Sequence, residues 1–330
     1  MAGPTGDRDV RYKILITHAI HPAAHARLET EAEVRVLQDQ TAAGLLSEIA
    51  DVDALLVRMP VAAEAIRAGR KLRVVARHGV GLDYIPVKTC TELRIPVVFT
   101  PDANTESVAE HVVSTMIALA HQIGRADRAV REGGWNVRDG LLGIDIRNRT
   151  LGIVGFGRIG VRVAEICRGA FSMRVLAFDP HLDDAAIAAR GAEPSSLEKL
   201  LESSDFVTLH APLTSGTRHL IDARALARMK RGSFLINHAR GGLVDTSALT
   251  EVLRSGHLGG AAVDVLEQEP PPDDLELLQL DNVIVTPHSA ALTDEAMRRM
   301  GSDAGDDILR VLRGERPKAC ANPEVLPAGS

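Results

Sequence analysis

The sequence predicts an α/β fold made of two doubly wound parallel-sheet domains, and three observations predict it. Short apolar runs alternate with helical patterns of about ten residues through most of the chain, and parallel strands need helical crossovers of that kind. A length of 330 residues exceeds what one ordinary hydrophobic core fills and suits two domains. One long helical stretch, residues 104–123, interrupts the alternation and divides it into two series.

The first series predicts a parallel sheet with helices between its strands. Its strands are expected at 13–16, 34–37, 54–57, 74–76 and 97–99, and its helices at 23–30 and 41–50. The stretch 104–123 then predicts one helix that bridges to the second domain. Asn104 is its candidate N-cap. Its apolar stripe is formed by Val108, Val112, Met116 and Leu119.

The second series predicts a second parallel sheet. Its short apolar strands, which suit a sheet covered on both faces, are expected at 151–154, 174–178, 206–209, 233–237, 260–265 and 283–286. The last helical pattern, 294–312, is long enough to return to the first domain. The prediction is therefore a discontinuous domain of residues 1–101 plus 292–330, and a second domain of residues 102–291. Residues 1–9 and 323–330 are expected to be loose tails.

Composition disfavours several classes of function. A net charge of −6 with 3% aromatic residues argues against a nucleic-acid-binding protein. No window approaches the ~18 consecutive apolar residues of a membrane span, and residues 1–14 lack the apolar centre of a secretion signal. The three cysteines are far apart and fit a reducing cytoplasm, which is the expected location: Cys90, Cys167 and Cys320.

A metal site is not expected. His18, His21 and His25 have metal-like spacing, but Pro22 interrupts their register. No acid or cysteine completes the set of four ligands that a structural site normally needs.

Residues 155–160, GFGRIG, match the G-x-G-x-x-G pattern between a predicted strand and a predicted helix. Gly155 permits a tight turn, and Gly157 lets backbone N–H groups approach a pyrophosphate. Gly160 allows close packing of helix on strand, and the amino end of the helix favours negative charge. The segment therefore predicts a dinucleotide-binding turn.

Asp179 ends the next strand, about 20 residues further on, where such turns place an acid. Its carboxylate would accept hydrogen bonds from the adenosine ribose and repel a 2′-phosphate, so NAD is favoured over NADP. The alternative is a solvated loop acid, because acids are common after strands.

Three polar residues follow later strands, where ligands bind in open parallel sheets: Arg240, Glu269 and His288. A guanidinium can hold a carboxylate through two parallel hydrogen bonds, and an imidazolium can protonate a developing alkoxide. A glutamate on the other ring nitrogen would orient the ring and stabilise its charge. Each residue alone also has a structural explanation. Together, downstream of a dinucleotide turn, they predict reduction of a 2-keto acid by NADH and the reverse oxidation.

Seven segments in order resemble the D-isomer-specific 2-hydroxyacid dehydrogenase family, which includes phosphoglycerate dehydrogenase and glyoxylate/hydroxypyruvate reductases. They are VVARHGVGLDYI, NTESVAEHVV, GIVGFGRIG, VTLHAPLT, NHARGGLVDTSAL, AAVDVLEQEPP and NVIVTPHSAA, and the resemblance covers roughly residues 12 to 322. It implies two Rossmann-like or flavodoxin-like domains with the active cleft between them, and a catalytic set of Arg240, Glu269 and His288. It also implies a homodimer, although some members are tetramers.

The resemblance implies further binding residues for the cofactor. Arg158 and Ile159 would lie at the pyrophosphate and Ala211 and Pro212 along the cofactor. Ala239 and Asp264 would lie at the nicotinamide end.

The substrate side is expected in the first domain. Gly79, Val80 and Gly81 fit the family's substrate loop, and consecutive N–H groups in such a turn can cradle a carboxylate. Arg58 would add a cation for a second acidic group, as in a phosphorylated or dicarboxylic substrate. The alternatives are an ordinary strand-ending turn and a solvated surface arginine.

Three departures from the family pattern bear on the substrate more than on the reaction class. The run Asp83-Tyr84-Ile85-Pro86 replaces the frequent Asn-Asp after the loop, and His238 replaces a small residue. Residues 289–291 stand where glycine is common. The candidate substrates stay glyoxylate or hydroxypyruvate and 3-phosphoglycerate. Because the chain stops at 330, the regulatory domains of longer phosphoglycerate dehydrogenases are not expected.

Two other functions stay open. A formate- or phosphite-type dehydrogenase has the same fold; Glu269 argues against formate, since the resembling formate enzymes carry Gln there, but phosphite is harder to exclude. An NAD(H)-sensing binding protein of the corepressor type can keep the catalytic residues. The lack of a basic or long interaction tail disfavours that function.

Overall fold

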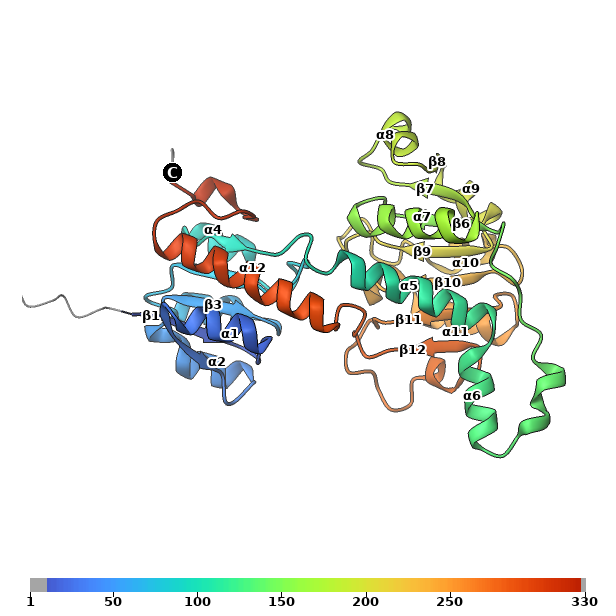
Figure 1. The fold of residues 1–330 in the computed structure, drawn as a ribbon, viewed down its shortest axis with the longest axis horizontal. Coiled ribbons are helices and arrows are strands. Elements are labelled where there is room, and N and C mark those ends of the chain that lie inside the picture. The colour runs from blue at the N-terminus through green and yellow to red at the C-terminus, as the bar shows by residue number, and fades with distance from the viewer. Residues whose placement is uncertain (1–10, 328–330) are drawn as a thin grey trace, which may run out of the picture. The chain divides into compact units, whose positions relative to one another are not determined.

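The computed structural model describes residues 11–327, which fold into two compact units (Figure 1). The first unit is Met1–Asn104 with Leu292–Ser330, and the second is Thr105–Ala291. The sequence placed the corresponding boundaries after residues 101 and 291. Each unit contains a parallel sheet covered by helices on both faces, so the predicted fold class is confirmed.

The first unit contains a five-stranded parallel sheet in the order β2-β1-β3-β4-β5. The strands are β1 (Tyr12–Ile16), β2 (Ala32–Val36), β3 (Ala54–Val57), β4 (Val74–Arg77) and β5 (Val97–Val98). Strand residues alternate between two apolar layers because successive side chains point to opposite faces. One face is covered by α1 (Pro22–Glu29) and α12 (Asp294–Leu312), and the other by α2 (Ala42–Glu48), α3 (Ala63–Ala68) and α4 (Val87–Glu92).

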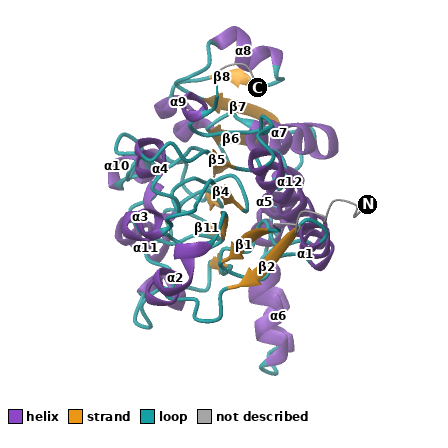
Figure 2. Ribbon diagram, turned by 90° about the vertical axis from the view of Figure 1, so that its left-hand side faces the viewer, coloured by secondary structure: helices purple, strands orange, loops and turns teal. Residues whose placement is uncertain are grey.

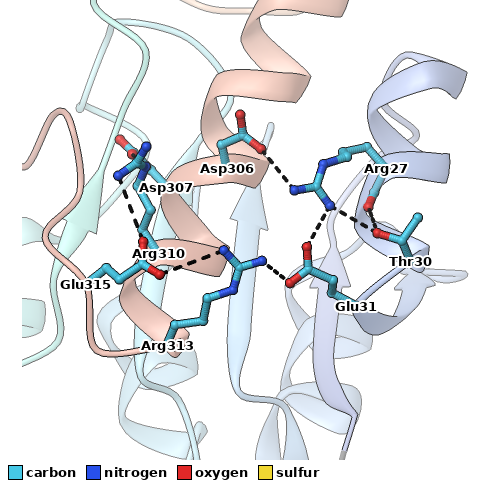
Figure 3. A network of polar contacts seen from close by, with 8 residues as sticks. All are labelled: Arg27, Thr30, Glu31, Asp306, Asp307, Arg310, Arg313 and Glu315. Carbon is cyan, nitrogen blue, oxygen red and sulfur yellow. Dashed lines mark hydrogen bonds and ion pairs between the residues drawn. The ribbon is translucent and has the colours of Figure 1, made fainter.

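The helix α12 begins and ends where the sequence predicted, and it packs beside α1 through charged as well as apolar residues (Figure 3). Arg27 of α1 lies 2.7 Å from Glu31 and 3.9 Å from Asp306 of α12, while Arg313 also pairs with Glu31. Hydrogen bonds and charge from Arg313 and Arg27 hold the pKa of Glu31 below its ordinary value. Because these pairs are largely solvated, each contributes little to stability, and the buried apolar face supplies most of the attachment.

The segment after α12 is ordered as far as residue 327, so the expectation of a loose tail from 323 is wrong for residues 323–327. Asn322 is buried; its Oδ1 accepts a 2.8 Å hydrogen bond from the N–H of Val97, and its Nδ2 donates to the Ile95 carbonyl at 3.0 Å. A short 3-10 turn, Pro323–Val325, follows and buries Val325. One asparagine therefore fixes this segment to the edge strand β5. Residues 1–10 and 328–330 lie outside the described part of the chain.

The second unit contains a seven-stranded parallel sheet in the order β12-β11-β10-β9-β6-β7-β8. Its strands are β6 (Thr150–Val154), β7 (Arg174–Phe178), β8 (Glu193–Pro194), β9 (Phe206–Leu209), β10 (Phe234–Asn237), β11 (Gly260–Val263) and β12 (Val283–Val285). From the central strand β6 the chain adds β7 and then β8 on one side. It then returns to β9, on the other side of β6, and continues through β10 and β11 to β12. The carboxyl ends of β6 and β9 are therefore the switch point at which such sheets bind ligands.

Helices cover both faces of this sheet. On one face lie α5 (Thr105–Ala120) and α7 (Arg158–Phe171); on the other lie α9 (Leu197–Ser203), α10 (Ala223–Arg228) and α11 (Thr246–Arg254). A further helix, α8 (Asp184–Ala189), precedes the edge strand β8. Both apolar layers are continuous, as expected for a sheet that is buried on its two faces.

The bridging helix buries the predicted stripe but is shorter than predicted. Val108, Val112, Met116 and Leu119 are all buried, which confirms the stripe. The helix ends at Ala120, however, and a second helix, α6 (Ile123–Arg131), begins after Gln122, whose φ is +53°. The helix begins directly after Asn104, at the predicted N-cap position, but within residues 11–327 the Oδ1 of Asn104 makes no hydrogen bond, so the expected side-chain cap is absent.

The helix α6 extends away from the sheet of the second unit (Figures 1 and 2). None of its residues is buried, and a 3-10 segment, Trp135–Gly140, follows it. Throughout residues 11–327, no helix is long and apolar enough to cross a membrane.

Candidate active site

The predicted cofactor and catalytic residues of the second unit follow the carboxyl ends of its parallel strands. Gly155 follows β6, Asp179 follows β7 and Ala211 lies two residues past β9. Arg240 and His288 each lie three residues beyond β10 and β12, and Asp264 directly follows β11. Since all neighbouring pairs of these strands are parallel, one edge of one sheet carries all of these positions.

The glycine-rich loop has the shape that the sequence predicted. Gly155 has φ +89°, and a Cβ built there would lie 2.6 Å from the backbone nitrogen of Ala211. A Cβ on Gly160 would lie 2.5 Å from the Gly155 carbonyl oxygen, so only glycine lets α7 approach β6 this closely. A Cβ on Gly157 would meet open space, as expected where a pyrophosphate approaches the backbone at the first turn of α7.

Replacement of Gly155 by alanine is expected to destabilise the protein by about 2–4 kcal/mol, because left-handed backbone and an overpacked contact each cost an L residue energy. Gly157→Ala is the matched control, since it adds the same methyl group into open space at φ −80°. Urea unfolding measures both. Equal stability of the two variants would contradict the proposed geometry.

Asp179 lies directly beside this loop. Its Oδ2 accepts a 2.8 Å hydrogen bond from the N–H of Phe156, and its Oδ1 accepts one of 2.9 Å from the N–H of His181. Each carboxylate oxygen retains a further lone pair for a ribose hydroxyl. Arg190 donates to the carbonyl of the same Phe156 at 3.0 Å.

Asp179→Ala is expected to lower the preference for NAD over NADP by about tenfold or more, because a negative charge that would repel the 2′-phosphate is removed. Arg190 stays beside the loop in that variant as a cation for the phosphate. The measurement is the ratio of kcat/KM with NADH to that with NADPH. Unaltered selectivity would show that the acid does not face the ribose.

His288 and Glu269 form the hydrogen-bonded pair that the sequence predicted. The Nδ1 of His288 lies 2.7 Å from the Oε2 of Glu269, and the Oε1 of Glu269 accepts a 3.0 Å hydrogen bond from the N–H of Leu266. The His288 side chain is 39% exposed. The glutamate therefore occupies one ring nitrogen and leaves the other for proton transfer.

Glu269 is held in its charged form. Burial alone would raise the pKa of this carboxyl group, while the hydrogen bond and charge of His288 lower it. The Leu266 N–H and the charge of Arg240 add to that effect, so the pKa of Glu269 lies below its ordinary value.

Asp264 organises the turn that carries His288. Its buried carboxylate accepts hydrogen bonds from the Thr286 hydroxyl at 2.6 Å and from the N–H groups of Ser289 at 2.8 Å and Ala290 at 2.9 Å. Its carbonyl accepts from the N–H of His288, whose φ is +52°. These bonds hold a left-handed conformation that is uncommon for residues other than glycine. The expected contact of Asp264 with nicotinamide stays a prediction.

Arg240 leaves β10 through a turn that is fixed by Asn237, a residue that the sequence analysis missed. The Nδ2 of Asn237 donates to the Arg240 carbonyl at 2.9 Å, and its Oδ1 accepts from the N–H of Ala239 at 3.2 Å. The Nη1 of Arg240 donates to the Ala239 carbonyl at 2.6 Å. The sequence signal that could have identified Asn237 is an asparagine at a strand end, three residues before the arginine.

In the first unit, the substrate-loop prediction needs one correction. The N–H of Gly79 donates to the buried Thr100 hydroxyl and to the Arg77 carbonyl, so it is not available to a carboxylate. Among residues 11–327, the N–H groups of Val80 and Gly81 have no such partner. The departure at Tyr84 has a structural role, because the Arg77 guanidinium lies over its ring at 4.5 Å.

Arg58 follows β3 in the first unit and is partly buried. Its guanidinium donates to the Ala19 carbonyl and lies 4.0 Å from the sulfur of Met297. Within the described part of the chain its side-chain contacts include no carboxylate, and burial is the cause of its pKa shift. Burial therefore lowers the pKa of its guanidinium, and an anion would offset that cost.

The three histidines near the start of the chain have other contacts. The Nδ1 of His18 lies 3.5 Å from the Thr17 hydroxyl, and His21 caps α1 by accepting from the N–H of Ala23 at 3.2 Å and lies 3.3 Å from Asp294. His25 lies 3.5 Å from Glu29. Among the residues that the structure describes, no group of three or more His, Cys, Asp or Glu side chains is arranged to hold a metal ion.

A dinucleotide-type loop with a histidine–carboxylate pair and an arginine at one sheet edge is the arrangement of a nicotinamide-dependent oxidoreductase. Comparison with known proteins is more specific. Residues 113–290 match the family model described as "D-isomer specific 2-hydroxyacid dehydrogenase, NAD binding domain".

Similar proteins cover nearly the whole chain. The D-3-phosphoglycerate dehydrogenase of Methanocaldococcus jannaschii is 41% identical over 96% of this chain and 60% of the relative. The glyoxylate reductase of Korarchaeum cryptofilum is 40% identical over 95% of this chain and 97% of the relative. The crystal structure of the TT0316 protein from Thermus thermophilus superposes with a TM-score of 0.85 at 35% identity, covering 94% of this chain and 99% of that one.

The chain belongs to the D-isomer specific 2-hydroxyacid dehydrogenase family, as its motifs predicted. NAD is the cofactor of the matched domain. The residues present fit that cofactor, since Gly157 faces open space at the start of α7 and Asp179 lies beside the loop. The chain spans about three fifths of the length of its phosphoglycerate dehydrogenase relatives and nearly all of the glyoxylate reductase.

Proposed function

We propose that the protein is an NAD-dependent D-2-hydroxyacid dehydrogenase that interconverts a small 2-keto acid and its D-2-hydroxy acid. One observation carries the proposal: His288 and Glu269 form a 2.7 Å pair at the ligand-binding edge of a domain that matches an NAD-binding family model. Arg240 follows β10, which neighbours the strand β11 that precedes Glu269, and its charge contributes to the lowered pKa of that carboxyl group.

Arg240 and His288 have separate roles in the proposed reaction. Arg240 binds the substrate carboxylate and polarises the keto group. When bound, NADH supplies a hydride to the carbonyl carbon. His288 gives a proton from Nε2 to the oxygen that becomes the hydroxyl group, because Nδ1 is held by Glu269. In the oxidative direction the neutral ring accepts that proton.

The remaining cofactor assignments belong to the same proposal. Arg158 and Ile159 begin α7 and would bind the pyrophosphate. Ala211 and Pro212, past β9, would line the cofactor, and Ala239 and Asp264 would lie at its nicotinamide end. The position of Ala211 against Gly155 supports the placement of the first of these.

A panel of keto acids with NADH and NADPH tests the proposal; it includes glyoxylate, hydroxypyruvate and phosphohydroxypyruvate. Turnover of at least one with NADH is expected. Tight NADH binding without turnover of any keto acid would instead support the corepressor-type sensor. Turnover of phosphite alone with NAD would support a phosphite-type dehydrogenase.

The substrate side of the proposal rests on the first unit, where Val80 and Gly81 offer N–H groups to a carboxylate beside Gly79. Arg58 is the candidate for a second acidic group, since it is partly buried and without a carboxylate partner in the described chain. Glyoxylate or hydroxypyruvate and 3-phosphoglycerate stay the candidate substrates.

Arg58→Met is expected to lower kcat/KM for phosphohydroxypyruvate about tenfold more than for glyoxylate, because an arginine–phosphate hydrogen bond is charge-assisted and glyoxylate lacks the group. Methionine keeps much of the apolar stem. Steady-state assays of both substrates measure the effect. An equal change for the two would remove Arg58 from substrate selection.

A homodimer is also part of the proposal. Four apolar residues on α6 and the segment after it are strongly exposed in one chain: Ile123 at 50%, Val130 at 46%, Trp135 at 69% and Leu142 at 86%. Such side chains favour burial against a second copy. Sedimentation should give twice the mass of the chain, and Val130→Glu with Trp135→Glu should give monomers.

A cytoplasmic location completes the proposal. Cys90, Cys167 and Cys320 are free thiols. Burial raises the pKa of both the Cys90 and the Cys167 thiol to about 12, so neither is reactive at neutral pH. Their free state supports a reducing compartment.

A further inference from the structure

His238, the residue that departs from the family pattern, contacts another histidine inside the second unit. The residue lies between the end of β10 and Arg240, and it is only 7% exposed. Its Nδ1 lies 3.3 Å from the Nδ1 of His111 on α5. The two rings meet edge to face, with centroids 4.7 Å apart and an interplanar angle of 67°.

The surroundings keep His238 neutral. Burial lowers its pKa to about 4; the charge of His111 acts in the same direction and that of Asp264 against it. His210 directly follows β9 and is partly buried; desolvation, with a smaller contribution from the charge of His238, lowers its pKa to about 3. At neutral pH the ring of His238 therefore carries a single N–H.

That proton belongs on Nδ1. The Nε2 of His238 is buried, and it has no hydrogen-bond partner in residues 11–327. A buried N–H without an acceptor is costly, and a buried lone pair is less costly there. The favoured arrangement is an N–H of His238 that donates to the Nδ1 of His111, whose own second nitrogen keeps its proton.

This hydrogen bond complements the bonds of Asn237. Asn237 closes the turn internally, from its side chain to Ala239 and Arg240. The bond between His238 and His111 instead ties the same turn to α5, a helix packed against β10. The backbone that leads to Arg240 is thus fixed on both sides.

We propose that His238, held by His111, is a positioning residue that fixes the turn carrying Arg240 and so sets the hold of the guanidinium on the substrate carboxylate. The inference rests on the proposed dehydrogenase function. Neither histidine needs to touch the substrate. An arginine displaced by a fraction of an ångström still permits chemistry but binds the carboxylate less well.

His238→Val, which keeps an apolar volume and removes the hydrogen bond, is expected to raise the KM for the keto acid about tenfold and to change kcat less than about threefold. His238→Asn, whose amide nitrogen takes the place of Nδ1, should restore KM to within about threefold of wild type. His257→Val is the matched control. Its Nε2 is likewise buried without a partner among residues 11–327, but it precedes β11 at the amino edge of the sheet.

If His238→Val does not fold, His111→Leu removes the same hydrogen bond from its other side. It should raise KM in the same direction, and the double variant with His238→Val should add little to either single change, because both remove one interaction. Additive effects, an unchanged KM in folded His238→Val, or an asparagine variant no better than valine would overturn the proposal. A wild-type enzyme that reduces no keto acid would instead overturn the proposed function, and this inference with it.

Discussion

Replacement of His288 by alanine lowers kcat for keto-acid reduction by an expected factor of about 10²–10⁴, the usual contribution of a positioned general acid. The physical reason is that Glu269 holds the Nδ1 of the ring and leaves Nε2 to deliver the proton. The affinity for NADH should change little, because the glycine-rich loop and Asp179 are untouched. Steady-state kinetics with a responsive keto acid, together with fluorescence titration of NADH, measure the two quantities.

The chain offers a matched control for this variant. His219 belongs to the same unit, also has a positive φ, and pairs with Glu267 through a 2.6 Å contact. His219→Ala therefore removes a similar histidine–glutamate pair that we place outside the reaction. It should keep kcat within about twofold of wild type, as surface changes usually do. A wild-type kcat in His288→Ala would refute the acid–base role.

The charge of Glu269 makes the stability of the His288–Glu269 pair depend on pH. The pKa of Glu269 lies below its ordinary value, so the carboxylate form prevails at neutral pH. A depressed carboxyl pKa contributes stability that is present above the ordinary value and is lost as pH falls through the folded-state value. The charge of the carboxylate is thus present at neutral pH. Glu269→Gln keeps a hydrogen bond without the charge and should lower kcat less than His288→Ala does.

Local patterns predicted most of the fold. Apolar runs bounded by turns placed β3, β7 and β9 at their observed bounds, and α12 at its observed ends. The glycine positions at 155 and 160 were predictable because their requirement is short-range: a turn and the close approach of a helix. The motifs shared with the family then predicted which functional residue follows each strand.

Interactions between distant residues could not be predicted in this way. The order of residues 323–327 depends on Asn322, which bonds to a strand more than 200 positions earlier. The N–H of Gly79 is occupied by Thr100, and the turn of His288 is held by Asp264. In each case the partner is a polar side chain whose position follows from tertiary structure, so no local pattern identifies it.

Replacement of Arg240 by alanine is expected to lower kcat/KM for the keto acid by about 10³–10⁴, equivalent to about 4–5 kcal/mol of lost transition-state stabilisation. Two interactions disappear together, the charge-assisted hold on the carboxylate and the polarisation of the keto group. Arg240→Lys should recover only part of the loss, because an ammonium cannot make two parallel hydrogen bonds to one carboxylate.

Arg218 provides the matched control for that change. It lies in the same unit with 62% of its side chain exposed, 3.8 Å from Glu267. Arg218→Ala should leave kcat/KM within about twofold, since a solvated arginine contributes little. The discriminating result is the difference between the two alanine variants at equal cofactor saturation. If Arg240→Ala keeps the kcat/KM of Arg218→Ala, the substrate carboxylate is bound elsewhere, and the mechanism loses the residue that orients the keto group toward His288.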